Sequence, residues 1–311
     1  MKGRAVRVAP WTVVLTAAAS VCAGQQTLYG GNQWLQVSSF NNGLLVTVDP
    51  GTGATTPIGK PSGVDRLSGL AFDAAGTLWA STVTGTPSGT LRTSTLITLD
   101  PADGSILSTI GPVLDGPGGL PMGLESLAVQ PGTDILLGTR GIADQNLRHA
   151  ADVYMIDKTT GVATLLFDNN NGFQEATIAF TPDGTLYQAL ASCCSPFGGH
   201  PKFEKLNPAT GAVLMTVSLP TYLKALAVGA DGTVVAAGPQ NLFASDVSDF
   251  YRIDPATGAA TKLGDTGHNP IGALAFGPAA ACARDCIQPR LPILPATPAR
   301  PAPREVERPS P

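Results

Sequence analysis

The sequence predicts an all-β fold, a five-bladed β-propeller of four-stranded antiparallel blades. Two repeated units predict it. An apolar strand followed by a turn of the Asp-Pro-x-Thr-Gly type occurs five times, and the Asp or Asn of that turn stands at positions 49, 100, 157, 207 and 254. A second apolar strand alternates with the first, and its central alanine is Ala71, Ala128, Ala179, Ala227 and Ala275. Short strands and turns that recur about every 50 residues are typical of propeller blades.

The residue types within each repeat explain why each predicted strand and turn forms. The strand with the central alanine is predicted to be innermost, because a small side chain fits the crowded axis. A hairpin turn with Gly76, Gly184 or Gly232 at positive φ leads to a second strand that begins Thr-Leu or Thr-Val. After a loop come the third strand, the Asp-Pro-x-Thr-Gly turn and the fourth strand. In that turn Pro presets φ, Asp bonds the backbone and Gly takes the left-handed conformation.

The two ends of the repeat are out of phase. Residues 27–31 match a second strand with no first strand before it, and residues 271–276 match a first strand with no second strand after it. We expect these two segments to pair and complete one blade, which closes the ring and leaves no exposed sheet edge.

Outside the repeat, the composition changes at both ends of the chain. Residues 1–23 read as a signal peptide, with three basic residues, a short apolar stretch and a small residue, Ala23, at the cleavage site. The protein is therefore expected to be secreted or periplasmic; a lipoprotein acylated at Cys22 is the alternative. Residues 24–287 form the predicted propeller domain, and residues 288–311 form a Pro-rich tail that is expected to be disordered. No later segment is apolar enough to cross a bilayer.

The charge distribution limits the partners. The chain carries a formal charge of −4, and its two ends are basic, so residues 24–287 are more acidic than the whole. This argues against nucleic acid as a partner, because phosphate binding needs clustered Lys and Arg. The expected partners are a cation, a small molecule, a carbohydrate or a protein, and the protein is expected to be a monomer.

The mature chain has four cysteines, and export favours disulfides. Cys193 and Cys194 end a second strand, whereas Cys282 and Cys286 follow a first strand. Because successive strands of a blade are antiparallel, the two pairs are expected on opposite faces, beyond the roughly 7 Å that a disulfide spans between Cα atoms. The sequence therefore predicts a local Cys282–Cys286 bridge. Cys193 and Cys194 form either a vicinal bridge or none.

Several common catalytic and metal-binding motifs are absent from the sequence. It contains no HExxH, GxSxG or paired CxxC. The three histidines, His149, His200 and His268, have no second His or Cys at zinc-ligand spacing. The motifs leave open whether the protein is an enzyme.

The repeated units DAAGTLWA, TPDGTLY and YxIDPxTG resemble the blades of bacterial secreted propellers of the NHL, gluconolactonase-like and YVTN groups, over residues 27–277. This resemblance implies the architecture. It does not imply one activity, because these groups include lactonases, lyases and binding scaffolds. Gluconolactonase-like enzymes hold a metal in the central channel with Glu, Asn and Asp. The resemblance therefore implies Ca²⁺ or another divalent cation as a candidate cofactor, although the metal-ligand motifs do not match this sequence residue by residue.

The ligand is expected on the face that carries the variable segments. The loops after second strands differ in every repeat and share one face with the links between blades, whereas the short turns on the other face are alike. The sequence predicts an exported binding or interaction module; the alternative is a metal-dependent hydrolase or lyase that acts in the channel. The candidate ligand-binding residues lie just before or at the start of first strands and are Asp65, Glu125, Asp168, Glu175 and His268.

Overall fold

The computed structural model describes one compact unit within Gln25–Ala280. The described residues are 26–33, 42–84, 93–141, 151–168, 175–191, 200–240, 247–267 and 270–279. The predicted signal peptide, the predicted Pro-rich tail, all five cysteines, His149 and His268 lie outside these ranges. Within the described residues, no helix is long and apolar enough to span a membrane.

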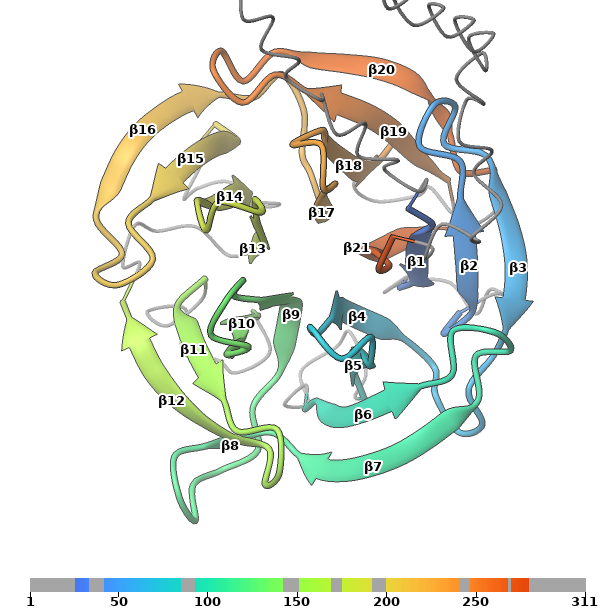
Figure 1. Ribbon diagram of the computed structural model, residues 1–311, viewed down its shortest axis with the longest axis vertical. Coiled ribbons are helices and arrows are strands. Elements are labelled where there is room, and N and C mark those ends of the chain that lie inside the picture. The colour runs from blue at the N-terminus through green and yellow to red at the C-terminus, as the bar shows by residue number, and fades with distance from the viewer. Residues whose placement is uncertain are drawn as a thin grey trace, which may run out of the picture. The chain divides into compact units, whose positions relative to one another are not determined.

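The described strands form five sheets around an axis, and each sheet is one blade (Figure 1). Blade 1 contains β21 (Ile271–Phe276), β1 (Leu28–Asn32), β2 (Leu45–Val48) and β3 (Thr55–Gly59). Blade 2 contains β4 (Leu67–Phe72), β5 (Leu78–Thr82), β6 (Thr95–Leu99) and β7 (Ile106–Pro112). Blade 3 contains β9 (Leu124–Val129), β10 (Leu136–Arg140), β11 (Val153–Ile156), β12 (Val162–Phe167) and an added strand, β8 (Leu114–Asp115). Blade 4 contains β13 (Glu175–Phe180), β14 (Leu186–Ala191), β15 (Lys202–Leu206) and β16 (Val213–Ser218). Blade 5 contains β17 (Ala225–Val228), β18 (Val234–Pro239), β19 (Ser248–Ile253) and β20 (Ala260–Asp265).

The predicted closure of the ring is confirmed in blade 1. Strand β21 pairs with β1 in antiparallel register, with Leu28 opposite Phe276 and Gly30 opposite Leu274. The Gln26 side chain extends this junction, because its Nε2 donates to the Gly277 carbonyl over 2.8 Å. The two ends of the repeat therefore complete one another, and the innermost strand of blade 1 comes from the far end of the chain.

The hydrophobic core is divided among the interfaces between neighbouring blades. One cluster joins blades 5 and 1, with Phe250 and Val235 packed in the same group as Val46 and Ile271. Four further large clusters join the other neighbouring pairs. Because side chains alternate between the two faces of a strand, each blade buries apolar residues against both of its neighbours.

The turn chemistry is as predicted. Gly76, Gly184 and Gly232 have φ values of 84°, 83° and 81°. In the turn after the third strand the Asp carboxylate accepts a backbone hydrogen bond from two residues on, as Asp254 does from the Ala256 N–H at 2.9 Å. Gly258 of this turn has a φ of 70° and contacts blade 4, since a Cβ there would lie 2.2 Å from Val217 Cγ2. The repeated Gly therefore serves the turn and the contact with the preceding blade.

Strand β8 is an addition to the predicted four-stranded blade. It lies beside the outermost strand of blade 3 and pairs with β12 in parallel, with Leu114 opposite Val162 and Asp115 opposite Ala163. The segment after β8 folds back through a bridge between Leu114 and Pro121. This addition gives blade 3 five strands instead of four.

The propeller has two faces, which we call the loop face and the turn face. The first strand of each blade starts at one face and ends at the other. The loop face carries the starts of the first strands and the ends of the second strands. The turn face carries the hairpins between first and second strands and the Asp-Pro-x-Thr-Gly turns.

Candidate functional site

A buried ion cluster lies at the loop-face end of the axis. The Lys224 ammonium, just before β17, is 2.6 Å from Glu125 Oε2 and 2.9 Å from Glu175 Oε2. The two carboxylates stand at the starts of β9 and β13, so three adjacent blades each contribute one charge. The exposed fractions of the side chains are 12% for Lys224, 3% for Glu125 and 7% for Glu175.

A fourth polar side chain joins the cluster from blade 1. Gln33 follows β1, is 3% exposed, and its Nε2 donates to Glu125 Oε2 over 3.4 Å. We call Gln33, Glu125, Glu175 and Lys224 the axial mouth. It brings side chains from four of the five blades to one end of the axis.

Two glycines make room for the axial mouth. A Cβ at Gly141 would lie 2.4 Å from Glu125 Cγ, and a Cβ at Gly272 would lie 2.3 Å from Gln33 Cβ. Gly272 stands three residues before Ala275, where Glu125 stands relative to Ala128. This repeat position therefore carries a charged side chain at Glu125, whereas the glycine at Gly272 leaves room for the Gln33 side chain.

The electrostatics of the mouth keep Lys224 charged. Burial alone would lower the pKa of Lys224, but the carboxylates of Glu125 and Glu175 outweigh burial and raise it. Lys224 is therefore an ammonium at neutral pH and serves as a hydrogen-bond donor and counter-ion. A neutral amine nucleophile is not available at this position.

The turn-face end of the axis has the opposite character. It holds a pocket of about 260 Å³. Its walls include the repeated alanines Ala71, Ala128, Ala179, Ala227 and Ala275 together with neighbouring Leu, Ile, Val and Phe side chains, and no charged side chain lines it. The prediction that small residues occupy the axis is therefore confirmed.

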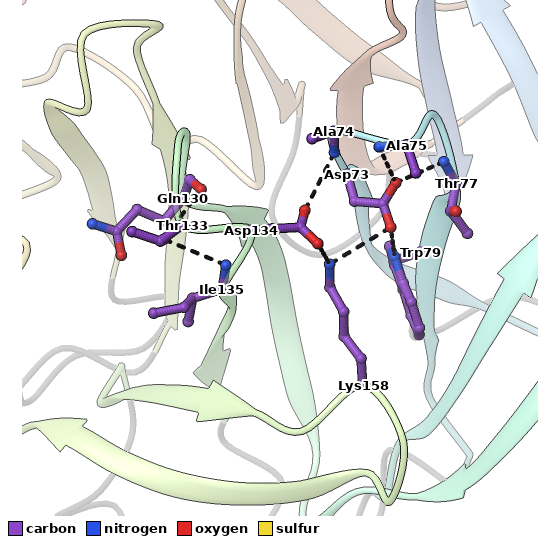
Figure 2. A network of polar contacts seen from close by, with 10 residues as sticks. All are labelled: Asp73, Ala74, Ala75, Thr77, Trp79, Gln130, Thr133, Asp134, Ile135 and Lys158. Carbon is purple, nitrogen blue, oxygen red and sulfur yellow. Dashed lines mark hydrogen bonds and ion pairs between the residues drawn. The ribbon is translucent and has the colours of Figure 1, made fainter.

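A second ionic network lies on the turn face, between blades 2 and 3 (Figure 2). Lys158 Nζ is 2.7 Å from Asp134 Oδ2 and 3.5 Å from Asp73 Oδ2, and it lies 5.4 Å from the centre of the Trp79 ring. The Trp79 Nε1–H donates to Asp73 Oδ2 over 2.8 Å. We call Asp73, Trp79, Asp134 and Lys158 the interblade clasp.

The predicted site residues have different places in the structure. Glu125 and Glu175 are brought together by Lys224, whereas Asp65 and Asp168 are exposed on the surface. His268 lies outside the described residues. The structure thus assembles two of the five candidates into one buried cluster.

The sequence reasoning missed Lys224 and Gln33. A signal for Lys224 was present, since it stands three residues before Ala227, as Glu125 does before Ala128. Gln33 carries no such signal, because it reaches the mouth from the end of a second strand whose first strand lies at the other end of the chain.

The axial mouth does not suit a divalent metal. Calcium binds six to eight oxygen ligands. At the mouth, an ammonium already lies between the two carboxylates. Within the described residues, no group of three or more His, Cys, Asp or Glu side chains could hold a metal ion.

Comparison with known proteins gives structural likenesses only. No protein-family model and no curated protein matches the sequence. A protein of unknown function from Bacteroides caccae is 14% identical, with a TM-score of 0.47 over 81% of this chain and 98% of that one. A putative 6-phosphogluconolactonase from Bacteroides fragilis is 13% identical, with a TM-score of 0.44 over 83% and 99%. The PQQ-bound aldose sugar dehydrogenase from Streptomyces coelicolor is 15% identical, with a TM-score of 0.42 over 83% and 86%. At these identities and scores, the activities named for those proteins are statements about those proteins alone.

Proposed function

We propose that the protein is a binding module and that its ligand binds at the axial mouth on the loop face. The observation that carries the proposal is that Gln33, Glu125, Glu175 and Lys224 meet in one buried cluster from four blades. Polar groups that meet at one point from separate blades are typical of ligand sites built on a rigid scaffold.

Stability alone is a poor reason for this cluster. Burying an ion pair costs desolvation energy that the attraction between the charges often fails to offset. A group of well-packed apolar side chains at the same place frequently makes the protein as stable as the ion pair does. The same protein lines the other end of its axis with alanine, leucine and phenylalanine. A buried charged cluster at one end only therefore favours a role in recognition.

The alternative, a metal-dependent hydrolase or lyase at the channel, needs a cation where Lys224 now lies. The ammonium would repel a divalent ion, and the two carboxylates are already its partners. The residues at the mouth thus favour binding over metal-assisted catalysis.

Export is a further part of the proposal. The basic and apolar leader of residues 1–23 supports secretion or a periplasmic location, where a binding module would meet external ligands. Comparing the N-terminal residue of the purified mature protein with Gly24 tests the cleavage site.

The binding proposal is tested with the double variant Glu125→Gln/Glu175→Gln. Saturation-transfer NMR with a mixed panel of small molecules is expected to show binding to the unsubstituted protein and loss of binding in the double variant. The matched control is Asp65→Asn/Asp168→Asn, which changes two exposed carboxylates and should keep the binding. Calcium-dependent lactone hydrolysis that disappears in the double variant would overturn the proposal in favour of the enzyme.

A further inference from the structure

We infer that Lys224 and Gln33 together recognise a hydroxyl group, so that the ligand of the axial mouth is a neutral polyhydroxylated compound. This inference rests on the proposed function and adds the chemical class of the ligand and the residues that select it.

The buried amide of Gln33 has an acceptor with no partner among the described residues. Gln33 is 3% exposed, and among the described residues no donor reaches its Oε1. A buried polar atom without a hydrogen bond costs about 1–3 kcal/mol. The opposite orientation of the amide would place its oxygen against Glu125 Oε2, which is itself an acceptor, so the hydrogen bond from Nε2 fixes which atom is left over.

The Lys224 ammonium supplies a donor at the same cluster. An ammonium has three N–H donors. One N–H of Lys224 donates to Glu125 Oε2, the ammonium also lies 2.9 Å from Glu175 Oε2, and no further acceptor contacts it among the described residues. Lys224 Nζ and Gln33 Nε2 both contact Glu125 Oε2, so the two residues adjoin the same carboxylate oxygen.

The charge of the mouth decides which ligand fits. Two carboxylates and one ammonium leave a net negative charge, which repels an anion. A cation would bring donors for Gln33 Oε1 and no acceptor for the Lys224 N–H. A hydroxyl both donates and accepts, so it satisfies both groups at once.

The two carboxylates then act as positioning residues. Glu125 orients both Lys224 and Gln33, and Glu175 holds the ammonium from the blade between those of Glu125 and Lys224. The ligand itself contacts Lys224 and Gln33. This separates the side chains that set specificity from those that hold them.

The test uses saturation-transfer NMR on the full mature chain with five named probes. Glucose, maltose and myo-inositol are neutral polyols, gluconate is an anion, and glucosamine is a cation. We expect the neutral probes to bind the unsubstituted protein, and Gln33→Leu to weaken them at least tenfold. Gln33→Leu should leave the melting temperature unchanged or raise it, because leucine removes the unpaired acceptor.

Two further variants make the test specific. Lys224→Met should also abolish binding of the neutral probes. Gln130→Leu is the matched control, because Gln130 lies in the turn between β9 and β10 on the turn face, and it should bind like the unsubstituted protein.

The outcomes separate the two proposals. Neutral binding that Gln33→Leu does not weaken, preferential binding of gluconate or glucosamine, or no binding of any probe overturns the inference about hydroxyl groups. If another compound binds and the Glu125→Gln/Glu175→Gln protein loses it, the axial mouth remains the binding site and only the ligand class is wrong.

Discussion

Lys158 is the residue at which the repeat departs most clearly from its own pattern. It follows the turn Asp157, at the position where the other four copies of the turn have proline. Its ammonium reaches the turns of blades 2 and 3 and the Trp79 ring, so the substitution adds a contact that proline cannot make. The partner Asp134 has a φ of 59°, in a hairpin one residue longer than that of blade 2. Two local departures from the repeat thus create one contact between blades.

Lys158→Met is expected to lower the free energy of unfolding by about 1 kcal/mol, since it removes two partly buried ion pairs and a cation–π contact. Urea denaturation measures the change. Lys60→Met is the control, because Lys60 is exposed and the change at such a site is typically within about 0.5 kcal/mol. Equal effects of the two substitutions would show that the interblade clasp contributes nothing.

Asp73 of the same clasp gives the protein a pH dependence. Burial acts to raise its pKa, but hydrogen bonds from Trp79 and Thr77 and the charge of Lys158 outweigh burial and hold the pKa below its ordinary value of 3.8. A lowered pKa means that the stabilisation is present above about pH 4 and is lost as the pH falls through the folded-state value. Melting temperatures measured from pH 6 to pH 2.5 should therefore fall less steeply for Asp73→Asn than for the unsubstituted protein. Parallel curves would contradict this assignment.

At the scale of the element, the turn after the third strand joins each blade to the one before it. The five turn glycines each lie against the preceding blade, where an added Cβ would meet a nearby atom. The pairs are Gly53 with Phe250, Gly104 with Gly59, Gly161 with Pro112, Gly211 with Phe167 and Gly258 with Val217. The turn therefore fixes the spacing of the blades as well as the direction of the chain.

Gly258→Ala and Gly184→Ala separate these two roles. Both glycines have positive φ, 70° and 83°, but nothing lies within 4 Å of a Cβ at Gly184, whereas Val217 would clash with one at Gly258. Gly184→Ala should cost about 1–2 kcal/mol for the left-handed backbone alone. Gly258→Ala should cost more, by about 1–3 kcal/mol for overpacking. Chemical denaturation compares them, and equal costs would exclude a steric role for the interblade contact.

At the scale of the whole molecule, the ring depends on the pairing of β21 with β1. A chain truncated after residue 270 loses the innermost strand of blade 1 and exposes the edge of β1. We expect it to lose its cooperative thermal transition in calorimetry. A chain truncated after residue 288 should keep the transition, since it retains all described residues. Similar transitions in both proteins would show that closure of blade 1 is dispensable.

A circular permutant tests the same closure without removing a strand. Joining Gly277 to Gln26 by a short linker is feasible because the Gly277 N–H donates to the Thr27 carbonyl over 2.8 Å. New ends between Ser62 and Gly63 fall at exposed residues in the link between blades 1 and 2. This permutant should melt within a few degrees of the natural order, because every strand pair is kept. A large loss of stability would mean that the order of the strands matters beyond their pairing.

The sequence by itself determined the repeat, the number of blades, the positive-φ glycines and the closure by residues 271–276. These features depend on local turn chemistry and on the count of strands, both of which can be read along the chain. Strand β8 was not predictable, because two residues that pair in parallel with an outer strand carry no periodic signal.

The sequence predicted the two carboxylates of the axial mouth but not the side chains that they contact. Glu125 and Glu175 could be placed near the axis from their positions before first strands, but their charge partner could not be chosen from sequence. That choice depends on which side chains of different blades come within 3 Å of one another, as Lys224 does with both carboxylates. The tertiary structure also brings Gln33 beside them, because closure of the ring places the first described strand next to the last.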